Sequence, residues 1–124
     1  MSDQKALILF AHGARDPRWA VPFERLQQLA GAQLPTVAVR LAFLELMTPQ
    51  LPATVAELVA AGIRTITVVP VFLGQGGHVL RDLPALIAQL QVSYPELSIA
   101  VADAVGESPE VLRAIAAYCV DSVI

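Results

Sequence analysis

Residues 6–19 read ALILFAHGARDPRW, and this stretch decides the fold. Its first part, Ala6–Ala11, is a continuous apolar run bounded by polar residues. Such a run is typical of a β-strand that is buried on both faces. Apolar residues then recur at helical spacing from about Arg18 to Gln33. The stretch therefore predicts a strand, a short polar loop and a helix in direct succession.

The same order of elements recurs three more times along the chain. Further strands are predicted at Val37–Leu44, Thr65–Leu73 and Ser98–Ala102. Thr48 and Ser108 each stand directly before a proline, which predicts an N-cap followed by Pro at the first helical position. A further helix is predicted from about residue 79. Strands that alternate with helices predict an α/β fold with a four-stranded parallel sheet and helices on both faces.

Two residues add detail to this pattern. Pro70 lies inside the third predicted strand, and a proline there predicts a sheet edge or a bulge. Cys119 is the only cysteine, and we expect it to be a small buried residue of the last helix. A single cysteine excludes a disulfide framework and a multi-cysteine zinc module, and it fits a reducing compartment.

The composition limits the classes of partner. Of the 124 residues, 56% are hydrophobic and 15% are charged, which excludes intrinsic disorder. The formal net charge is −3 and the chain has no basic stripe, so we expect no nucleic-acid partner. No apolar run approaches the length of a membrane span, so we expect a cytoplasmic protein without a membrane partner. The apolar excess in so short a chain predicts oligomerisation.

Chemically active residues follow the predicted strands, at the edge where parallel α/β sheets bind ligands. His12 comes directly after the first strand, Glu45 after the second, and His78 after the third. Two histidines and a carboxylate suit a divalent transition metal, and an imidazole also suits a general base. The alternative for His12 is a loop histidine that bonds nearby backbone, and for Glu45 a solvated carboxylate.

Other residues near these positions suit an anionic ligand. Arg15 is a candidate for binding carboxylates, whereas Arg18 and Arg40 are interpreted as surface residues. Gly76 and Gly77 allow the backbone before His78 to approach a ligand closely. The chain contains no dinucleotide fingerprint, Walker A motif or nucleophile elbow, so we expect no organic cofactor.

Three segments together resemble a known family. They are LILFAHGARDPRW (7–19), LAFLELMTPQLP (41–52) and VVPVFLGQGGHVLRDLP (68–84). In order and separation they resemble the short form of sirohydrochlorin cobaltochelatase and its close relative sirohydrochlorin ferrochelatase, the single-domain class II chelatases. The resemblance covers nearly the whole chain, and its most specific part is Gly76 to Pro84. It implies a flavodoxin-like chelatase domain that spans residues 1–124.

The resemblance also implies an activity and a site. Chelatases of this family insert Co²⁺ or Fe²⁺ into sirohydrochlorin in cobalamin or sirohaem biosynthesis, and Ni²⁺ is a further candidate here. The family's metal and catalytic residues correspond to His12, His78 and Glu45. Short members pair as homodimers, in agreement with the apolar excess. The substrate-binding candidates are the following residues: Gly13, Arg15, Phe43, Gly76 and Gly77.

Two other functions remain open at this point. The first is a non-catalytic carrier of a tetrapyrrole or a metal that uses the same pocket. The second is a flavodoxin-like interaction module in which the two histidines are incidental. Turnover separates the chelatase from the carrier, and metal affinity separates both from the module.

Overall fold

The computed structural model of the protein describes residues 4–74 and 77–123, with backbone only for 77–80. The strands are β1 (Lys5–Ala11), β2 (Ala38–Phe43), β3 (Thr65–Pro70) and β4 (Ser98–Val101). The α-helices are α1 (Val21–Gln33), α2 (Leu51–Ala60), α3 (Gly77–Ser93) and α4 (Pro109–Asp121). Two short 3₁₀ helices, η1 (Pro17–Ala20) and η2 (Val105–Glu107), precede α1 and α4.

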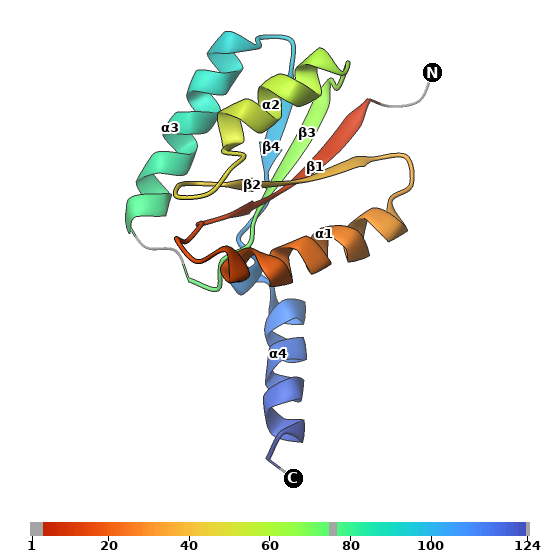
Figure 1. Cartoon of the computed structure of the whole chain (residues 1–124), viewed down its shortest axis with the longest axis vertical. Helices are drawn as coiled ribbons and strands as arrows, with labels where there is room; N and C mark the ends of the chain where they lie inside the picture. The colour runs from red at the N-terminus through yellow and green to blue at the C-terminus, as the bar shows by residue number, and fades with distance from the viewer. Residues whose placement is uncertain (1–3, 75–76, 124) are drawn as a thin grey trace.

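The four strands form one parallel sheet in the order β2-β1-β3-β4 (Figure 1). This arrangement confirms the predicted four-stranded parallel sheet. After β1, the chain crosses to β2 on one side of β1 and then to β3 on its other side. The two central strands are therefore β1 and β3. All strand ends that precede a helix meet at one edge, which we call the carboxyl edge.

The two faces of the sheet have separate hydrophobic cores. Alternate residues of β1 point to opposite faces, as strand geometry requires. Ile8 and Phe10, both fully buried, pack with α2 and α3 on one face. Leu9 packs with the apolar side of α1 on the other face, where Trp19 and Phe23 lie against it. Helices thus cover both faces, as predicted.

Several predicted boundaries change in the structure. The helix expected to begin at Pro49 begins at Leu51 instead, after a cis Thr48–Pro49 peptide, and its N-cap is Gln50. Pro70 does not mark a sheet edge, because β3 is a central strand. It is the last residue of β3, where a missing backbone N–H no longer interrupts the ladder. Ser108, by contrast, caps α4 as predicted, with its Oγ accepting from the Val111 N–H at 3.4 Å.

Helix α4 leaves the body of the molecule at the carboxyl edge and projects away from it (Figure 1). Within the described chain, α4 has no buried residue, and its main contact is with η2. Cys119 is consequently exposed, and the prediction that it is buried was wrong. Among the described residues, no helix combines the length and the apolar character needed to cross a membrane.

Candidate functional site

The loops after β1 and β2 lie against each other at the carboxyl edge. The Glu45 N–H donates to the His12 carbonyl at 3.1 Å, and the Leu44 N–H donates to the Ala11 carbonyl at 2.9 Å. Gly13 has a φ of +95°, and a side chain there would collide with the backbone carbonyl of Glu45. Glycine at position 13 is therefore what lets His12 and Glu45, predicted as a pair, lie side by side.

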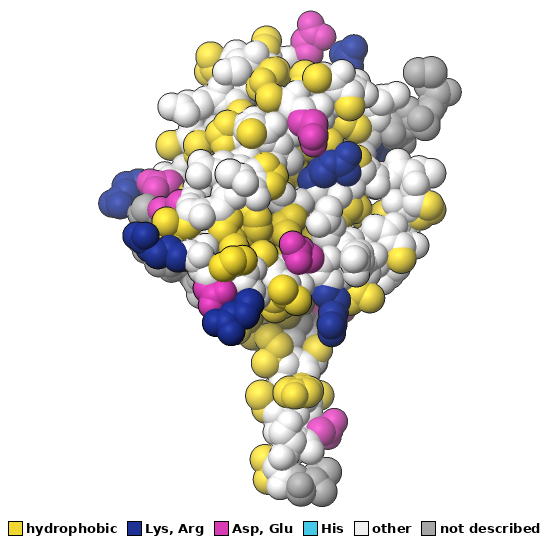
Figure 2. All heavy atoms as spheres, viewed as in Figure 1, with side chains coloured by type: hydrophobic (Ala, Val, Ile, Leu, Met, Phe, Trp, Pro, Cys, Tyr) yellow, Lys and Arg dark blue, Asp and Glu magenta, His cyan; other side chains and the backbone are white. Residues whose placement is uncertain are grey.

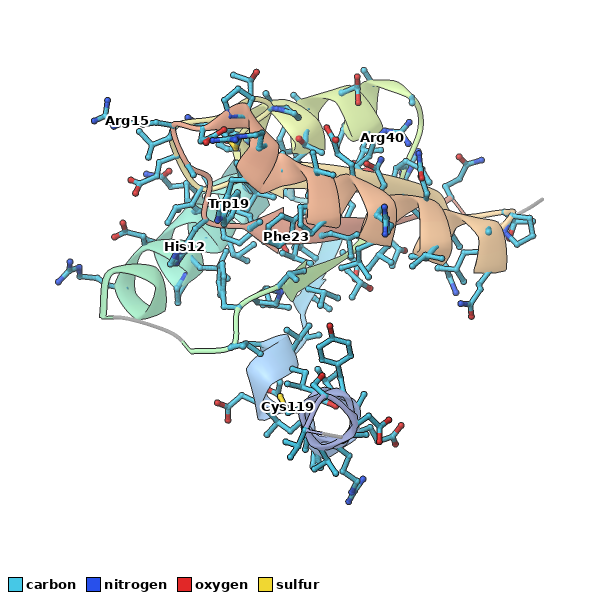
Figure 3. The ribbon with its side chains drawn as sticks, turned by 60° about the horizontal axis from the view of Figure 1, so that its bottom comes forward. His12, Arg15, Trp19, Phe23, Arg40 and Cys119 are labelled. Atoms are coloured by element: carbon cyan, nitrogen blue, oxygen red, sulfur yellow. The ribbon has the colours of Figure 1, made fainter. Side chains whose placement is uncertain are left out.

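The His12 side chain points inward at this edge (Figure 3). Its ring lies against the ring of Phe72, with centroids 4.5 Å apart and planes inclined by 50°. Its Nε2 atom is buried and has no hydrogen-bond partner among the described residues. Buried polar nitrogens are nearly always bonded in folded proteins, so an unpartnered one commonly has a functional reason. The alternative interpretation, a loop histidine that bonds nearby backbone, finds no such bond at this nitrogen among the described residues.

Glu45 lines a cavity of about 360 Å³ between the end of β2 and α3. Asp82 of α3 lines the same cavity, so a second carboxylate stands near the predicted one. The candidate residues drawn from the sequence did not include Asp82. The sequence did contain a signal for Asp82, which is its spacing from His78. Residues four positions apart share one face of a helix, so this spacing predicts Asp82 on the same face as His78.

His78 is the second residue of α3, and Gly77 is the first. The helix thus begins at the carboxyl edge, after the loop that follows β3, and two residues before the predicted start at about residue 79. The side chain of His78 and the whole of Gly76 lie outside the described residues. Among the described side chains, no three His, Cys, Asp or Glu residues are grouped closely enough to hold a metal ion. His12 and Glu45 are the two predicted metal residues whose side chains are described.

The arginines near this edge differ in their partners. Arg18 donates to the Asp16 carboxylate at 2.7 Å, and Arg40 pairs with Glu57 at 3.5 Å, so both are occupied surface residues as predicted. Arg15 makes no hydrogen bond or ion pair with any described residue. Its side chain points outward from the loop, away from His12 (Figure 3).

The Asp16–Arg18 pair also accounts for the perturbed ionisation in this loop. Hydrogen bonds from the Arg18 side chain, and then from its backbone N–H, hold the pKa of Asp16 below its usual value. The same contact raises the pKa of Arg18. Asp16 caps η1 through this backbone bond of 2.9 Å, so the pair stabilises the loop that carries His12.

A second cavity of about 360 Å³ lies on the other side of the edge. Arg15, Phe43 and Met47 are among the residues that line it. Phe43 is only 4% exposed and packs mainly in the α1-side core, where Trp19 contacts it at 6.4 Å between ring centroids. A cation, Arg15, and apolar side chains such as Phe43 thus line the same cavity.

Known proteins share this chain's sequence and fold. A curated sirohydrochlorin cobaltochelatase of Methanocaldococcus jannaschii is 31% identical over 90 residues, which are 73% of this chain and 63% of that protein. The chain spans about three fifths of the length of several such relatives.

Two solved structures superpose well on it. A cobalamin (vitamin B12) biosynthesis CbiX protein from Marinobacter aquaeolei VT8 has a TM-score of 0.81 and 32% identity, with 96% of this chain and 97% of that chain covered. SirB from Bacillus subtilis with Fe³⁺ also has a TM-score of 0.81, at 26% identity, and this chain covers 48% of it.

The resemblance found in the three sequence segments is thereby confirmed. The CbiX family model matches residues 6–121, which include every candidate site residue named above. By that match, the chain belongs to the CbiX family.

Proposed function

We propose that this chain is a sirohydrochlorin metal chelatase that inserts a divalent ion into the tetrapyrrole. Co²⁺ is the proposed physiological substrate metal, with Fe²⁺ and Ni²⁺ as alternatives. Membership of the CbiX family and the names of its relatives support the reaction class. The observation that carries the proposal for this chain is the buried Nε2 of His12 at the carboxyl edge, which has no hydrogen-bond partner among the described residues.

Metal insertion requires an ion that is held by few and exchangeable ligands. Neutral imidazole and carboxylate are suitable ligands for Co²⁺, Ni²⁺ and Fe²⁺. We assign ligation to His12 Nε2 together with His78 and Glu45, with the metal treated as a substrate that leaves with the product. The backbone bond between Glu45 and His12, and the start of α3 at the same edge, support this assignment.

The reaction also releases protons. Two pyrrole N–H groups of the macrocycle lose their protons as the divalent ion enters, so overall charge is conserved. A group with a free lone pair must accept each proton near the centre of the ring. Imidazole has a pKa near neutrality and suits this role, and a carboxylate at Glu45 can pass the proton on to water.

The tetrapyrrole carries several carboxylates around its rim. Arg15, which makes no bond to a described residue, is the proposed cation for one of them. The α3 terminus at Gly77, with Gly76 before it, and Gly13 would supply backbone N–H groups or close approach. Phe43 would contribute to the apolar surface beneath the ring. We further propose a homodimer in the cytoplasm that uses no organic cofactor.

An anaerobic absorbance assay tests this function. Sirohydrochlorin is mixed with Co²⁺, Fe²⁺ or Ni²⁺, with and without the protein, and formation of the metallated product is followed. His12→Phe keeps an aromatic ring against Phe72 but removes Nε2, so we expect it to fold and to lose catalysed insertion. Arg64→Ala removes an exposed charge at the opposite edge of the sheet and is the matched control.

The outcomes separate the three candidate functions. Acceleration that His12→Phe and the His12→Ala, His78→Ala double variant abolish, and that Arg64→Ala retains, supports the chelatase. Tight binding of metal or tetrapyrrole without acceleration indicates a carrier. Absence of both, in a folded protein, indicates an interaction module. An active His12→Phe variant refutes the assignment of His12.

A further inference from the structure

Leu46 combines an exposed apolar side chain with an unfavourable backbone conformation. It directly follows Glu45 in the loop between β2 and α2, and it is 54% exposed. Its φ is +67°, and among the described residues it is the only non-glycine residue with a positive φ. Leucine rarely adopts this left-handed conformation, whereas glycine and asparagine adopt it more readily. Folding alone would therefore favour glycine or asparagine at this position.

Exposure by itself does not mark Leu46 as a functional residue. Apolar side chains lie among charged ones over much of the visible face of the body (Figure 2), as they do on most soluble proteins. Leu46 differs because its exposure comes together with backbone strain, although its side chain fills no core. Strained residues of this kind cluster at ligand sites, where the surrounding structure fixes their conformation.

Backbone hydrogen bonds fix the loop that carries Leu46. The Phe43 N–H donates to the Pro49 carbonyl at 2.9 Å, which closes the loop at its two ends. The Glu45 N–H donates to the His12 carbonyl at 3.1 Å, which ties the residue before Leu46 to the end of β1. The left-handed turn at Leu46 is therefore imposed by contacts on both sides of it.

The apolar neighbours of Leu46 are anchored in the protein, whereas Leu46 is not. Leu44 packs against the core between the sheet and helices α2 and α3, and Met47 packs against the α1-side core. Leu46 belongs to neither core of the described chain. It lines instead the cavity of about 360 Å³ that Arg15 and Phe43 also line. This cavity therefore offers an apolar side chain, an aromatic ring and a cation to the same ligand.

We propose that Leu46 is a specificity-determining residue for the tetrapyrrole, with its side chain in contact with the apolar macrocycle while Arg15 binds a carboxylate of the rim. The inference rests on the function proposed above and adds a contact that selects the organic substrate. A leucine has no atom that ligates a metal ion, so its side chain contributes to the affinity for the tetrapyrrole and not to that for the metal. A small anion would bind Arg15 without gaining from Leu46.

The exposed part of Leu46 sets the size of the expected effect. Complete burial of a leucine side chain corresponds to roughly a ten- to hundredfold change in an equilibrium constant. About half of Leu46 remains to be buried, so loss of the contact should weaken tetrapyrrole binding by about four- to tenfold. Because the loop is already fixed, little ordering of the chain offsets this gain on binding.

Three variants separate the side chain of Leu46 from its backbone. Leu46→Asn has nearly the same shape and tolerates a positive φ, but its side chain is polar. Leu46→Gly removes the side chain and the strain together. Leu46→Met keeps an apolar side chain of similar size. Leu29→Ala truncates a leucine that is 58% exposed in the second half of α1, and it is the matched control.

Equilibrium titration with metal-free sirohydrochlorin, followed by absorbance, measures the affinity for the tetrapyrrole. We expect Leu46→Asn and Leu46→Gly to raise the Kd by about four- to tenfold, and Leu46→Met and Leu29→Ala to keep the Kd of the parent. In the insertion assay, the first two variants should raise the KM for sirohydrochlorin and leave the KM for Co²⁺ unchanged. Their Tm should equal or exceed that of the parent, because the strain at position 46 is relieved.

Four results would overturn the role of Leu46. They are a Leu46→Asn variant with the Kd of the parent, a change in the KM for Co²⁺ alone, a lowered Tm in both Leu46→Asn and Leu46→Gly, and a changed sedimentation coefficient, which would place Leu46 in contact with a second copy. A parent that does not bind sirohydrochlorin would overturn this role and the chelatase together. The titration needs no turnover, so the chelatase can fail in a protein that still binds the tetrapyrrole through Leu46. Conversely, insertion that Leu46→Asn leaves unchanged would retain the chelatase and remove this contact.

Discussion

Replacement of Gly13 by alanine should destabilise the fold at the carboxyl edge. Gly13 has a φ of +95°, a backbone region that residues with a side chain adopt only at a cost. The added Cβ would also occupy the position of the Glu45 carbonyl oxygen. That oxygen is backbone and is not a flexible side-chain end, so the two loops must separate.

The size of the loss of stability follows from the positive φ of Gly13 and from the collision with the Glu45 carbonyl. The left-handed conformation costs about 1–2 kcal/mol for alanine. Separation of the loops weakens the 3.1 Å bond from the Glu45 N–H to the His12 carbonyl, for about 1 kcal/mol more. The smaller entropy of the unfolded alanine chain offsets roughly 0.5 kcal/mol. The net loss is about 2 kcal/mol in the free energy of unfolding, or a fall in Tm of about 8 °C for a chain of this length.

Urea and thermal unfolding, followed by circular dichroism at one fixed protein concentration, measure this loss. Gly31→Ala is the matched control, because Gly31 lies in α1, where an added Cβ would meet no side chain and no other segment within 4 Å. We expect that variant to gain up to about 1 kcal/mol, since alanine is the better helix former. If Gly13→Ala unfolds at the same urea concentration as the parent, the close approach of the two loops is not what requires glycine.

Two further predictions concern the same edge. Gly106→Ala should lower the free energy of unfolding by about 1–2 kcal/mol in urea titrations, because its Cβ would meet the backbone of Leu73. The lowered pKa of Asp16 implies stability that is present above pH 3.8, its unfolded value, and is lost as the pH falls through the lower folded value. Between about pH 5 and pH 2, the free energy of unfolding of Asp16→Asn should therefore fall less than that of the parent. The difference should be small and should shrink when salt is added, because both Asp16 and Arg18 are exposed.

The order of strands and helices could be predicted from the sequence because the signals are local. The apolar run Ala6–Ala11 is buried on both faces, and only a central strand of a covered parallel sheet has that environment. Ser108 likewise acts through its own neighbours, as the N-cap of α4. The start of α2 was wrong because Pro49 and Pro52 both offer a helix start, and local rules do not choose between them.

The predictions that failed depend on contacts between distant segments. The apolar side of α4 is evident from its periodicity, but periodicity does not show what packs against it, and Cys119 was therefore placed in a core that the described chain does not form. Asp82 was missed because its approach to Glu45 depends on how α3 lies beside the end of β2. His12 was identified from its position after a strand, yet the contact of its ring with Phe72, 60 residues away, depends on the tertiary fold.

The burial of His12 Nε2 has a kinetic consequence. Because this nitrogen is closed to solvent behind its neighbours, a solute reaches it only in the moments when the Phe72 ring or the surrounding loop moves aside. Any reaction at this atom then has an upper rate that the opening motion sets. Raising the solute concentration accelerates the reaction only up to that limit, and a smaller side chain at position 72 would raise the limit itself.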